Sequence, residues 1–237
     1  ITGFERMKRL IAGFEALTRW VDSTGKVHLP GTIAAAFDDH DVSTALTRTM
    51  LGRVVSQMRD WSERGMEFGH VALNASTADL QQPDFGDGIL QFLHDAGISP
   101  RRLQLEVTET VFLARGADRV ERSLRTLSSH GIRIALDDFG TGYASLSHLK
   151  QFPVDIIKID RSFVSDVRND EQHSAIAEAV IMLGKNLGIE VVAEGIETDA
   201  QARWLLDVGC HYGQGFLFSP AVPAEDLDDL SRIFPVC

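Results

Sequence analysis

The sequence of 237 residues has few cysteines and no long apolar run. Its two cysteines, Cys210 and Cys237, lack the spacing of a metal site, and so few thiols favour a reducing compartment over a disulfide-stabilised fold. No run of about 18 apolar residues occurs, and the N-terminal residues lack the charged-then-apolar pattern of a signal peptide. Neither membrane insertion nor secretion is indicated. We therefore expect a cytoplasmic domain, which a membrane or sensory module outside this chain could carry.

Basic charge is also scarce, because 23 lysines and arginines face 34 acidic residues and the formal net charge is −11. Duplex nucleic-acid binders recruit phosphates with a basic face, so the charge balance argues against that class. An anionic ligand would need metal ions to supply positive charge locally. The eight histidines are scattered without the spacing of a zinc site, so any metal is expected to be held mainly by oxygen.

What the sequence does contain is a regular alternation of short apolar runs and helical patterns. Its hydrophobic content of 44% and charged content of 24% are ordinary for a soluble globular protein. Seven segments are predicted to be strands: Leu10–Leu17, Val71–Ala75, Leu103–Val107, Ile132–Leu136, Asp155–Ile159, Ile189–Ala193 and Gly215–Phe218. Strict alternation with short connections predicts a parallel sheet covered by helices. No linker divides the chain, so residues 1–237 are predicted to form one domain.

Two architectures fit this alternation. An open doubly wound sheet usually carries a Gly-rich phosphate loop after its first strand, and none is present. Polar residues at nearly every strand end favour a closed, TIM-like (β/α)8 barrel of the α/β class, with a pocket at the carboxyl ends of its strands. Residues 1 to 9 do not have the pattern of a buried strand, so the first strand is expected to be absent or poorly represented.

The polar residues at the strand ends are the candidate site. They are expected to converge although they are far apart in sequence, and they are Glu15, Asn74, Glu106, Asp137, Asp138, Lys158, Glu194 and Gln214. Any one acid of this kind could instead cap the helix that follows it. Glu15 is a stronger candidate, since an unpaired carboxylate among its apolar neighbours would be costly.

Strand geometry divides the acids further. Glu106 and Glu109 are three positions apart and would face opposite sides of a regular strand, so Glu109 is predicted to hold a neighbouring loop rather than a metal. Asp137 and Asp138 are adjacent and would also point apart. The glycines at 140 and 142 predict that the pleat breaks here, which would let both carboxylates flank a pair of cations.

Charge counting indicates two cations. Five carboxylates, from Glu15, Glu106, Asp137, Asp138 and Glu194, carry −5, whereas two divalent ions and Lys158 would carry +4 and +1. Ligation by carboxylate and amide oxygens suits Mg²⁺ or Mn²⁺ better than zinc.

The ordered motifs resemble those of the EAL-domain phosphodiesterases, which hydrolyse the bacterial second messenger cyclic di-GMP. The motifs run from about Leu10 to Leu230: Glu15-Ala16-Leu17 with Thr18-Arg19-Trp20, Leu73-Asn74-Ala75-Ser76, Glu106-Val107-Thr108-Glu109, Asp137-Asp138-Phe139-Gly140-Thr141-Gly142-Tyr143, Ile157-Lys158-Ile159-Asp160, Ala193-Glu194-Gly195-Ile196-Glu197-Thr198 and Gln214-Gly215-Phe216. Each motif alone is weak evidence, but seven in family order are specific.

The resemblance implies a TIM-like barrel that holds two divalent cations and cleaves cyclic di-GMP to linear pGpG by in-line attack of water. The implied metal ligands are Glu15, Asn74, Glu106, Asp137, Asp138 and Glu194. Lys158 would orient or deprotonate the attacking water, with Glu15 and Glu194 also in the catalytic set. Leu17, Arg19, Glu197 and Gln214 would line the substrate site, and Glu109 would anchor the loop from Phe139 to Leu146. That loop lies near a dimer interface in relatives, which implies a homodimer, and relatives are usually multidomain signalling proteins.

Two other functions stay open. A catalytically silent receptor for cyclic di-GMP would share the fold, although no metal-site position is missing here. A different metal-dependent barrel enzyme, acting on a small acid or sugar, is the third alternative.

Overall fold

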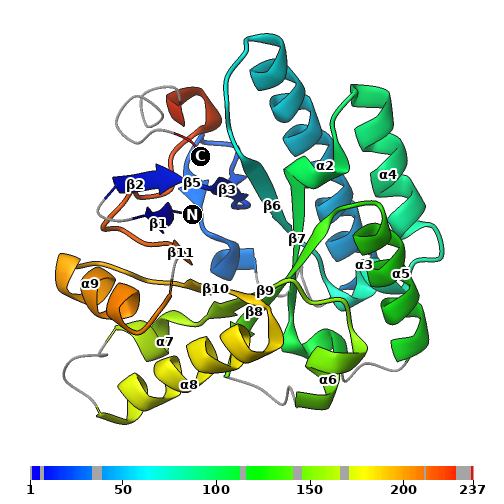
Figure 1. Cartoon of the computed structure of the whole chain (residues 1–237). Coiled ribbons are helices and arrows are strands. Elements are labelled where there is room, and N and C mark those ends of the chain that lie inside the picture. The colour runs from blue at the N-terminus through cyan, green and yellow to red at the C-terminus, as the bar shows by residue number, and fades with distance from the viewer. Residues whose placement is uncertain are drawn as a thin grey trace.

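The computed structural model describes residues 2–5, 8–33, 39–112, 116–140, 146–165, 171–210, 212–227 and 236. Its centre is a nine-stranded sheet in the order β2-β1-β11-β10-β9-β8-β7-β6-β3 (Figure 1). These strands are β1 Thr2–Glu5, β2 Lys8–Ile11, β3 Gly13–Ala16, β6 His70–Asn74, β7 Leu103–Thr108, β8 Arg133–Phe139, β9 Ile156–Ile159, β10 Glu190–Ala193 and β11 Tyr212–Gly213. The two outermost strands in this order, β2 and β3, follow each other in the chain with Ala12 between them. The chain itself therefore closes the barrel.

Strand β1 is the part of the barrel that the sequence did not reveal. Residues 2–5 form a short strand that pairs antiparallel with both β2 and β11, whereas the successive pairs from β3 to β11 are parallel. If β2 and β3 count as one interrupted strand, the nine strands become eight. The predicted TIM-like (β/α)8 architecture is confirmed, with its first strand present, short and reversed.

One strand prediction was wrong. The last barrel strand is Tyr212–Gly213 rather than Gly215–Phe218, which forms a bend and a turn after Gln214. Gly215 has a φ of 154°, and an added Cβ would lie 2.2 Å from the carbonyl oxygen of Ile196. The chain turns here because only a glycine fits this close approach. The other six predicted strands overlap observed ones.

Helices cover the outer face of the barrel (Figure 1). They are α2 His40–Glu63, α3 Thr77–Gln81, α4 Phe85–Ala96, α5 Ala117–Ser129, α6 Leu146–Gln151, α7 Arg161–Val164, α8 Glu171–Leu187 and α9 Asp199–Asp207. Local sequence sets several ends. Asp39 accepts hydrogen bonds from the first amides of α2, and Ser76 forms a capping box with Asp79 in α3. No described helix is long and apolar enough to cross a membrane.

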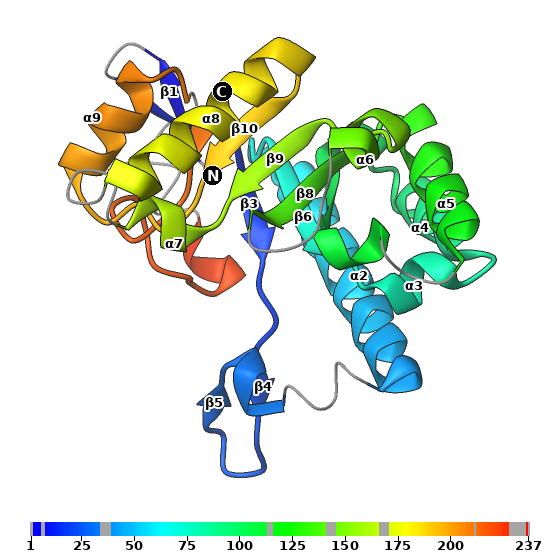
Figure 2. The same cartoon turned by 90° about the horizontal axis from the view of Figure 1, so that it is seen from below.

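Shorter elements complete the chain. Four 3₁₀ helices occur among the described residues, at Pro30–Ile33 (η1), Pro100–Arg102 (η2), Glu109–Phe112 (η3) and Ala224–Asp226 (η4). A hairpin of β4 (Trp20–Val21) and β5 (Val27–His28) projects away from the barrel (Figure 2).

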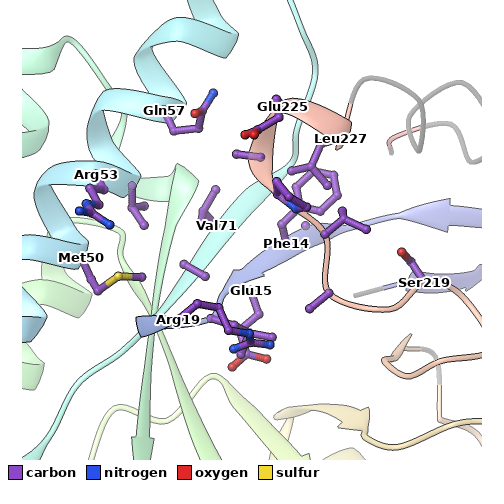
Figure 3. Close-up of a pocket in the computed structure, with 18 of the residues that line it drawn as sticks. Phe14, Glu15, Arg19, Met50, Arg53, Gln57, Val71, Ser219, Glu225 and Leu227 are labelled. Carbon is purple, nitrogen blue, oxygen red and sulfur yellow. The ribbon is translucent and has the colours of Figure 1, made fainter. Parts of the chain in front are cut away.

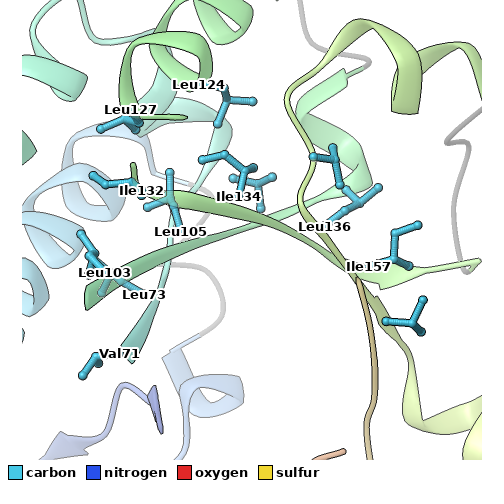
Figure 4. Close-up of a cluster of buried hydrophobic side chains, with 14 of the residues drawn as sticks. Val71, Leu73, Leu103, Leu105, Leu124, Leu127, Ile132, Ile134, Leu136 and Ile157 are labelled. Carbon is cyan, nitrogen blue, oxygen red and sulfur yellow. The ribbon is translucent and has the colours of Figure 1, made fainter. Parts of the chain in front are cut away.

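Alternation along the strands decides what faces the helices and what faces the barrel interior. Leu105, Ile134, Leu136 and Ile157 pack outward with Leu124 and other helix residues in one large core (Figure 4). A second, small cluster lies inside the barrel and contains Ala135, Ile156 and Val192. Because side chains two positions apart in a strand share a face, each interior residue near the amino end lies below a residue near the carboxyl end.

Candidate active site

Lys158, near the carboxyl end of β9, lies at the centre of the acidic residues. Its side chain is buried, and its Nζ is 2.7 Å from Glu106 Oε2 and 2.8 Å from Glu194 Oε1. Asp137 Oδ1 and Glu15 Oε2 follow at 3.3 and 3.6 Å. These four acids come from four other strands or strand ends, so the structure brings together the residues that the barrel pattern predicted to converge.

The charge state of Lys158 follows from these neighbours. Burial alone would lower its pKa, but the carboxylates of Glu106, Glu194, Glu15 and Asp137 raise the pKa well above the ordinary value. Lys158 is therefore a stable ammonium in this arrangement. It lies within hydrogen-bond distance of the carboxylates of Glu106 and Glu194.

The single positive charge of Lys158 does not neutralise the negative charge of the acids around it. Burial raises the pKa of Glu194 to about 7, and it raises the pKa of Glu106 and Asp138 above their ordinary values. Repulsion by Asp137 adds to the increase for all three. Glu15 differs: burial would raise its pKa, but Lys158 and the side-chain amides of Gln214 and Asn74 lower it. The site therefore holds excess negative charge that a cation would stabilise.

Asp137 and Asp138 lie on the same side of the chain although they are adjacent. Asp138 has a φ of 54°, and the pairing of β8 with β9 shifts register between Leu136 and Phe139. The expected break in the pleat is thus present, but it occurs at Asp138 within β8, and Gly142 lies outside the described residues. Among the described residues, oxygens of Asp137, Asp138 and Glu194 lie within 4.8 Å of one another, close enough to share one ion.

Two amides flank Glu15. Asn74 Nδ2 donates to its Oε1 at 3.0 Å, and Gln214 Nε2 donates to its Oε2 at 2.7 Å. The carbonyl Oε1 of Gln214 is buried and has no hydrogen-bond partner in the described part of the chain. This acceptor would suit a cation or a donor group of a ligand.

Glu109 takes a different position from Glu106. It begins η3, its side chain is buried, and its Oε1 accepts a hydrogen bond of 2.8 Å from the backbone N–H of Gly140. Gly140 has a φ of 98° and immediately precedes residues 141–145, which lie outside the described structure. Glu109 thus contacts the start of the segment that it was predicted to anchor.

A cavity of about 1130 Å³ adjoins the site at Glu15 and Gln214. Leu17 and Arg19 also line it, as do Met50, Arg53 and Gln57 from α2 and the segment from Phe218 to Leu227 (Figure 3). Ligand sites are commonly about 300–1,000 Å³, so there is room for a ligand of dinucleotide size. Arg19 and Arg53 place positive charge along it.

The structure separates one predicted residue from this cavity and adds others. Glu197 is exposed and does not line the cavity; its backbone N–H donates to Gln201. Arg53 and Gln57 were not predicted, because helical periodicity identifies a core face and not which other face borders a ligand. Gln104 was also missed. It lies two residues before Glu106 and therefore shares its side of β7, a signal that strand alternation offered.

The residues present fit divalent cations of the Mg²⁺ or Mn²⁺ type. The available donors are carboxylate and amide oxygens, the acids exceed the charge of Lys158, and Gln214 offers a buried carbonyl without a partner. The acids on which this rests are Glu15, Glu106, Asp137, Asp138 and Glu194.

Comparison with known proteins gives a consistent result. The family model described as "EAL domain" matches residues 6–221. The curated protein MucR of Pseudomonas aeruginosa, a bifunctional diguanylate cyclase/cyclic di-GMP phosphodiesterase, is 36% identical over 215 residues, which are 91% of this chain and 31% of MucR. Signaling protein YkoW of Bacillus subtilis is 35% identical over 95% of this chain and 28% of its own length. The chain thus spans about a third of the length of these relatives.

Solved structures agree on the fold. The PaMucR phosphodiesterase in complex with c-di-GMP has a TM-score of 0.85 and 36% identity, over 91% of this chain and 87% of that one. BlrP1 of Klebsiella pneumoniae, in a calcium/cy-diGMP complex, has a TM-score of 0.75 and 32% identity, over 88% of this chain and 51% of that one.

Proposed function

Because this chain belongs to the EAL domain family, we propose that it is a phosphodiesterase that hydrolyses cyclic di-GMP to linear pGpG with two divalent cations. The observation that carries the proposal is the convergence of Glu15, Glu106, Asp137 and Glu194 on Lys158 at the carboxyl ends of the strands. The cyclic di-GMP complexes of PaMucR and BlrP1 support the choice of substrate.

The metal ligands in this proposal are Glu15, Asn74, Glu106, Asp137, Asp138 and Glu194. Bound cations, Mg²⁺ or Mn²⁺, would neutralise phosphate charge and lower the pKa of a bound water. Glu15 and Glu194 are assigned to the catalytic set from the family resemblance, and both also contact Lys158. The amides of Asn74 and Gln214 hold the Glu15 carboxylate in one orientation.

Lys158 acts on the attacking water. Lys158 would orient the water by donating a hydrogen bond to its oxygen, or deprotonate it where cations bound to the surrounding acids lower the pKa of the ammonium. The water oxygen attacks phosphorus in line, the bond from phosphorus to the 3′ oxygen breaks, and the proton that the water loses is balanced by one gained on the 3′ oxygen, which leaves linear pGpG.

Substrate contacts are assigned to Leu17, Arg19 and Gln214, which line the large cavity, and to Glu197 from the family resemblance alone. Arg19 would pair with a phosphate. Glu109 would hold the segment that begins at Gly140, so Glu109→Ala should lower turnover while leaving the cations bound. Normal turnover in Glu109→Ala would reject that role.

The decisive experiment is hydrolysis of cyclic di-GMP by the purified chain with Mg²⁺ or Mn²⁺, with and without a chelator, and with the products separated by chromatography. We expect pGpG to form only with a cation, and Glu15→Ala to abolish its formation. Binding of cyclic di-GMP without hydrolysis in either cation would instead support the receptor alternative.

The chain is also proposed to be one domain of a longer signalling protein and to form a homodimer. MucR and YkoW are both much longer than the matched part. Light scattering at several concentrations, with and without cyclic di-GMP, would test the dimer.

A further inference from the structure

We infer that Gln104 is a positioning residue for Glu106, and that it acts from the opposite, amino end of the barrel. The inference rests on the proposed function, because Glu106 is one of the proposed metal ligands. It concerns a residue that lies outside the carboxyl-end acids and that none of the sequence motifs contains.

The first observation is a direct contact between two buried side chains. Gln104 Nε2 lies 3.2 Å from Glu106 Oε1, and both residues are on the interior side of β7. Gln104 is 1% exposed and Glu106 is fully buried. The other carboxylate oxygen of Glu106 accepts from Lys158 at 2.7 Å. Glu106 is therefore held at each oxygen by a different donor.

The second observation fixes the orientation of the Gln104 amide. The NH₂ group donates to Glu106 Oε1, so the carbonyl Oε1 of Gln104 faces away from Glu106. Within the described structure, that Oε1 is buried without a partner. Gln104 lines a cavity of about 230 Å³ at the amino end of the barrel, which we call the amino-end cavity; His70, Arg133, Ile156, Glu190 and Tyr212 also line it.

The amino-end cavity has room for a hydrogen-bond donor to the carbonyl Oε1 of Gln104. Its lining includes polar residues, among them His70, Arg133 and Glu190, and it is large enough to admit several water molecules, each of which can donate to a buried acceptor. His70 lines the same cavity, and its buried Nε2 is a second polar atom without a partner among the described residues. Water held between Gln104 Oε1 and His70 Nε2 would fix the carbonyl of the Gln104 amide, while Glu106 fixes its NH₂ group.

The consequence is a chain of contacts in which the amino-end cavity orients Gln104, Gln104 orients Glu106, and Glu106 contacts Lys158. Groups that hydrogen-bond a metal ligand typically change metal affinity by about 10–100-fold when they are removed. Without Gln104, the Glu106 carboxylate keeps one donor and is free to rotate about its last side-chain bond. Its oxygens then spend less time in the orientation that a cation requires.

The test is the affinity for Mn²⁺, measured by titration with electron paramagnetic resonance in the absence of substrate. Gln104→Met keeps the length and volume of the side chain but cannot donate. We expect Gln104→Met to bind Mn²⁺ about 10–100-fold more weakly than the wild type. Turnover of cyclic di-GMP should fall at low Mn²⁺ and recover as Mn²⁺ is raised.

A matched control separates positioning from lost stability. Val120 is fully buried in α5, outside the proposed site, so Val120→Ala should lower the melting temperature without changing Mn²⁺ affinity. Gln104→Asn, which withdraws the amide by one methylene group, replaces Gln104→Met if that variant does not fold, and should show the same loss of affinity.

The outcomes distinguish this inference from the function on which it rests. Equal Mn²⁺ affinity in the wild type and the folded Gln104 variant would overturn the positioning role alone. A wild type that binds no Mn²⁺ would overturn both the proposed function and this inference.

Discussion

The two ends of the barrel interior are built from the same strands but differ in charge balance and burial. At the carboxyl end, Lys158 is buried against four acids that outnumber it. At the amino end, Arg133 Nη2 pairs one to one with Glu190 Oε2 at 2.7 Å, and both side chains are substantially exposed. Buried charge without a balancing partner lowers stability, so its presence at the carboxyl end indicates a functional site there. The exposed ion pair at the amino end carries no such cost.

The residues between the two ends are small or apolar, with Gln104 as an exception. Ala135, Ile156 and Val192 form the interior cluster, and Gln104 is a buried polar residue that links the amino-end cavity to Glu106. Predictions about either end therefore test whether a change at one end affects stability or activity at the other.

The largest effect is expected for Lys158→Met, which keeps the side-chain length and removes the charge. Breaking a buried ion pair by removing one partner typically costs about 3–5 kcal/mol, so the free energy of unfolding should fall by that order. Hydrolysis should slow by roughly 10²–10⁴, more than cyclic di-GMP binding weakens. Urea unfolding and steady-state kinetics would measure these changes. Full activity in Lys158→Met would contradict the role assigned to Lys158.

The second largest effect is expected from divalent cations. A ligand at 100 times its Kd stabilises the folded state by about 2.7 kcal/mol, which for a domain of this size raises Tm by roughly 5–10 °C. Differential scanning fluorimetry with Mg²⁺ or Mn²⁺ against Na⁺ at equal ionic strength would show it. Asp138→Asn is the control and should reduce the shift. An equal shift in Na⁺ would argue against a specific site.

At the amino end, the lowered pKa of His70 predicts that the protein loses stability in acid. Burial, together with nearby positive charge that includes Arg133, lowers the pKa of His70 from 6.5 to about 4, although Glu190 lines the same cavity. Between these values the unfolded state binds more protons, so this contribution is complete above pH 6.5 and is lost as the pH falls toward 4.

The pH dependence has its own control. Relative to His70→Gln, which does not titrate, the wild type should lose about 2 kcal/mol of stability between pH 7 and pH 4.5. Urea unfolding at both pH values would measure the difference. Equal changes in the free energy of unfolding for the two proteins would show that His70 is protonated equally in the folded and unfolded states.

The smallest effect is expected for Arg133→Met. The Arg133–Glu190 pair has side chains that are 38% and 43% exposed, and such pairs contribute less than about 1 kcal/mol. Urea unfolding should show a change of that size or less. A loss comparable to that of Lys158→Met would remove the contrast between the two ends.

Strand ends were predictable from sequence because alternation and burial are local signals. Glu106 and Lys158 interrupt apolar strands, and their convergence follows from a closed parallel barrel. The position of Asp138 was anticipated only in part. A break in the pleat was expected from the nearby glycines, but the left-handed backbone at Asp138 coincides with a shift in the register of β8 against β9, which is a tertiary feature.

Other features were not predictable because they depend on tertiary contacts. Strand β1 is short, and its pairing with β11 joins residues separated by most of the chain. The segment Gly215–Phe218 has an apolar strand-like composition, yet the close approach of Gly215 to Ile196 turns the chain. The lining of the large cavity by Arg53 depends on how α2 packs beside the C-terminal segment, which periodicity does not encode.

The hydrogen bond between Gln214 and Glu15 joins residues 199 positions apart. Contacts so distant in sequence form late in folding, because a long loop must close before they stabilise the chain. A ribosome adding about 5–20 residues per second needs roughly 10–40 s to reach Gln214 after Glu15. We therefore expect the acids of the middle strands to assemble on the growing chain first, and Glu15 to gain its partner Gln214 only after the strands between them have been synthesised.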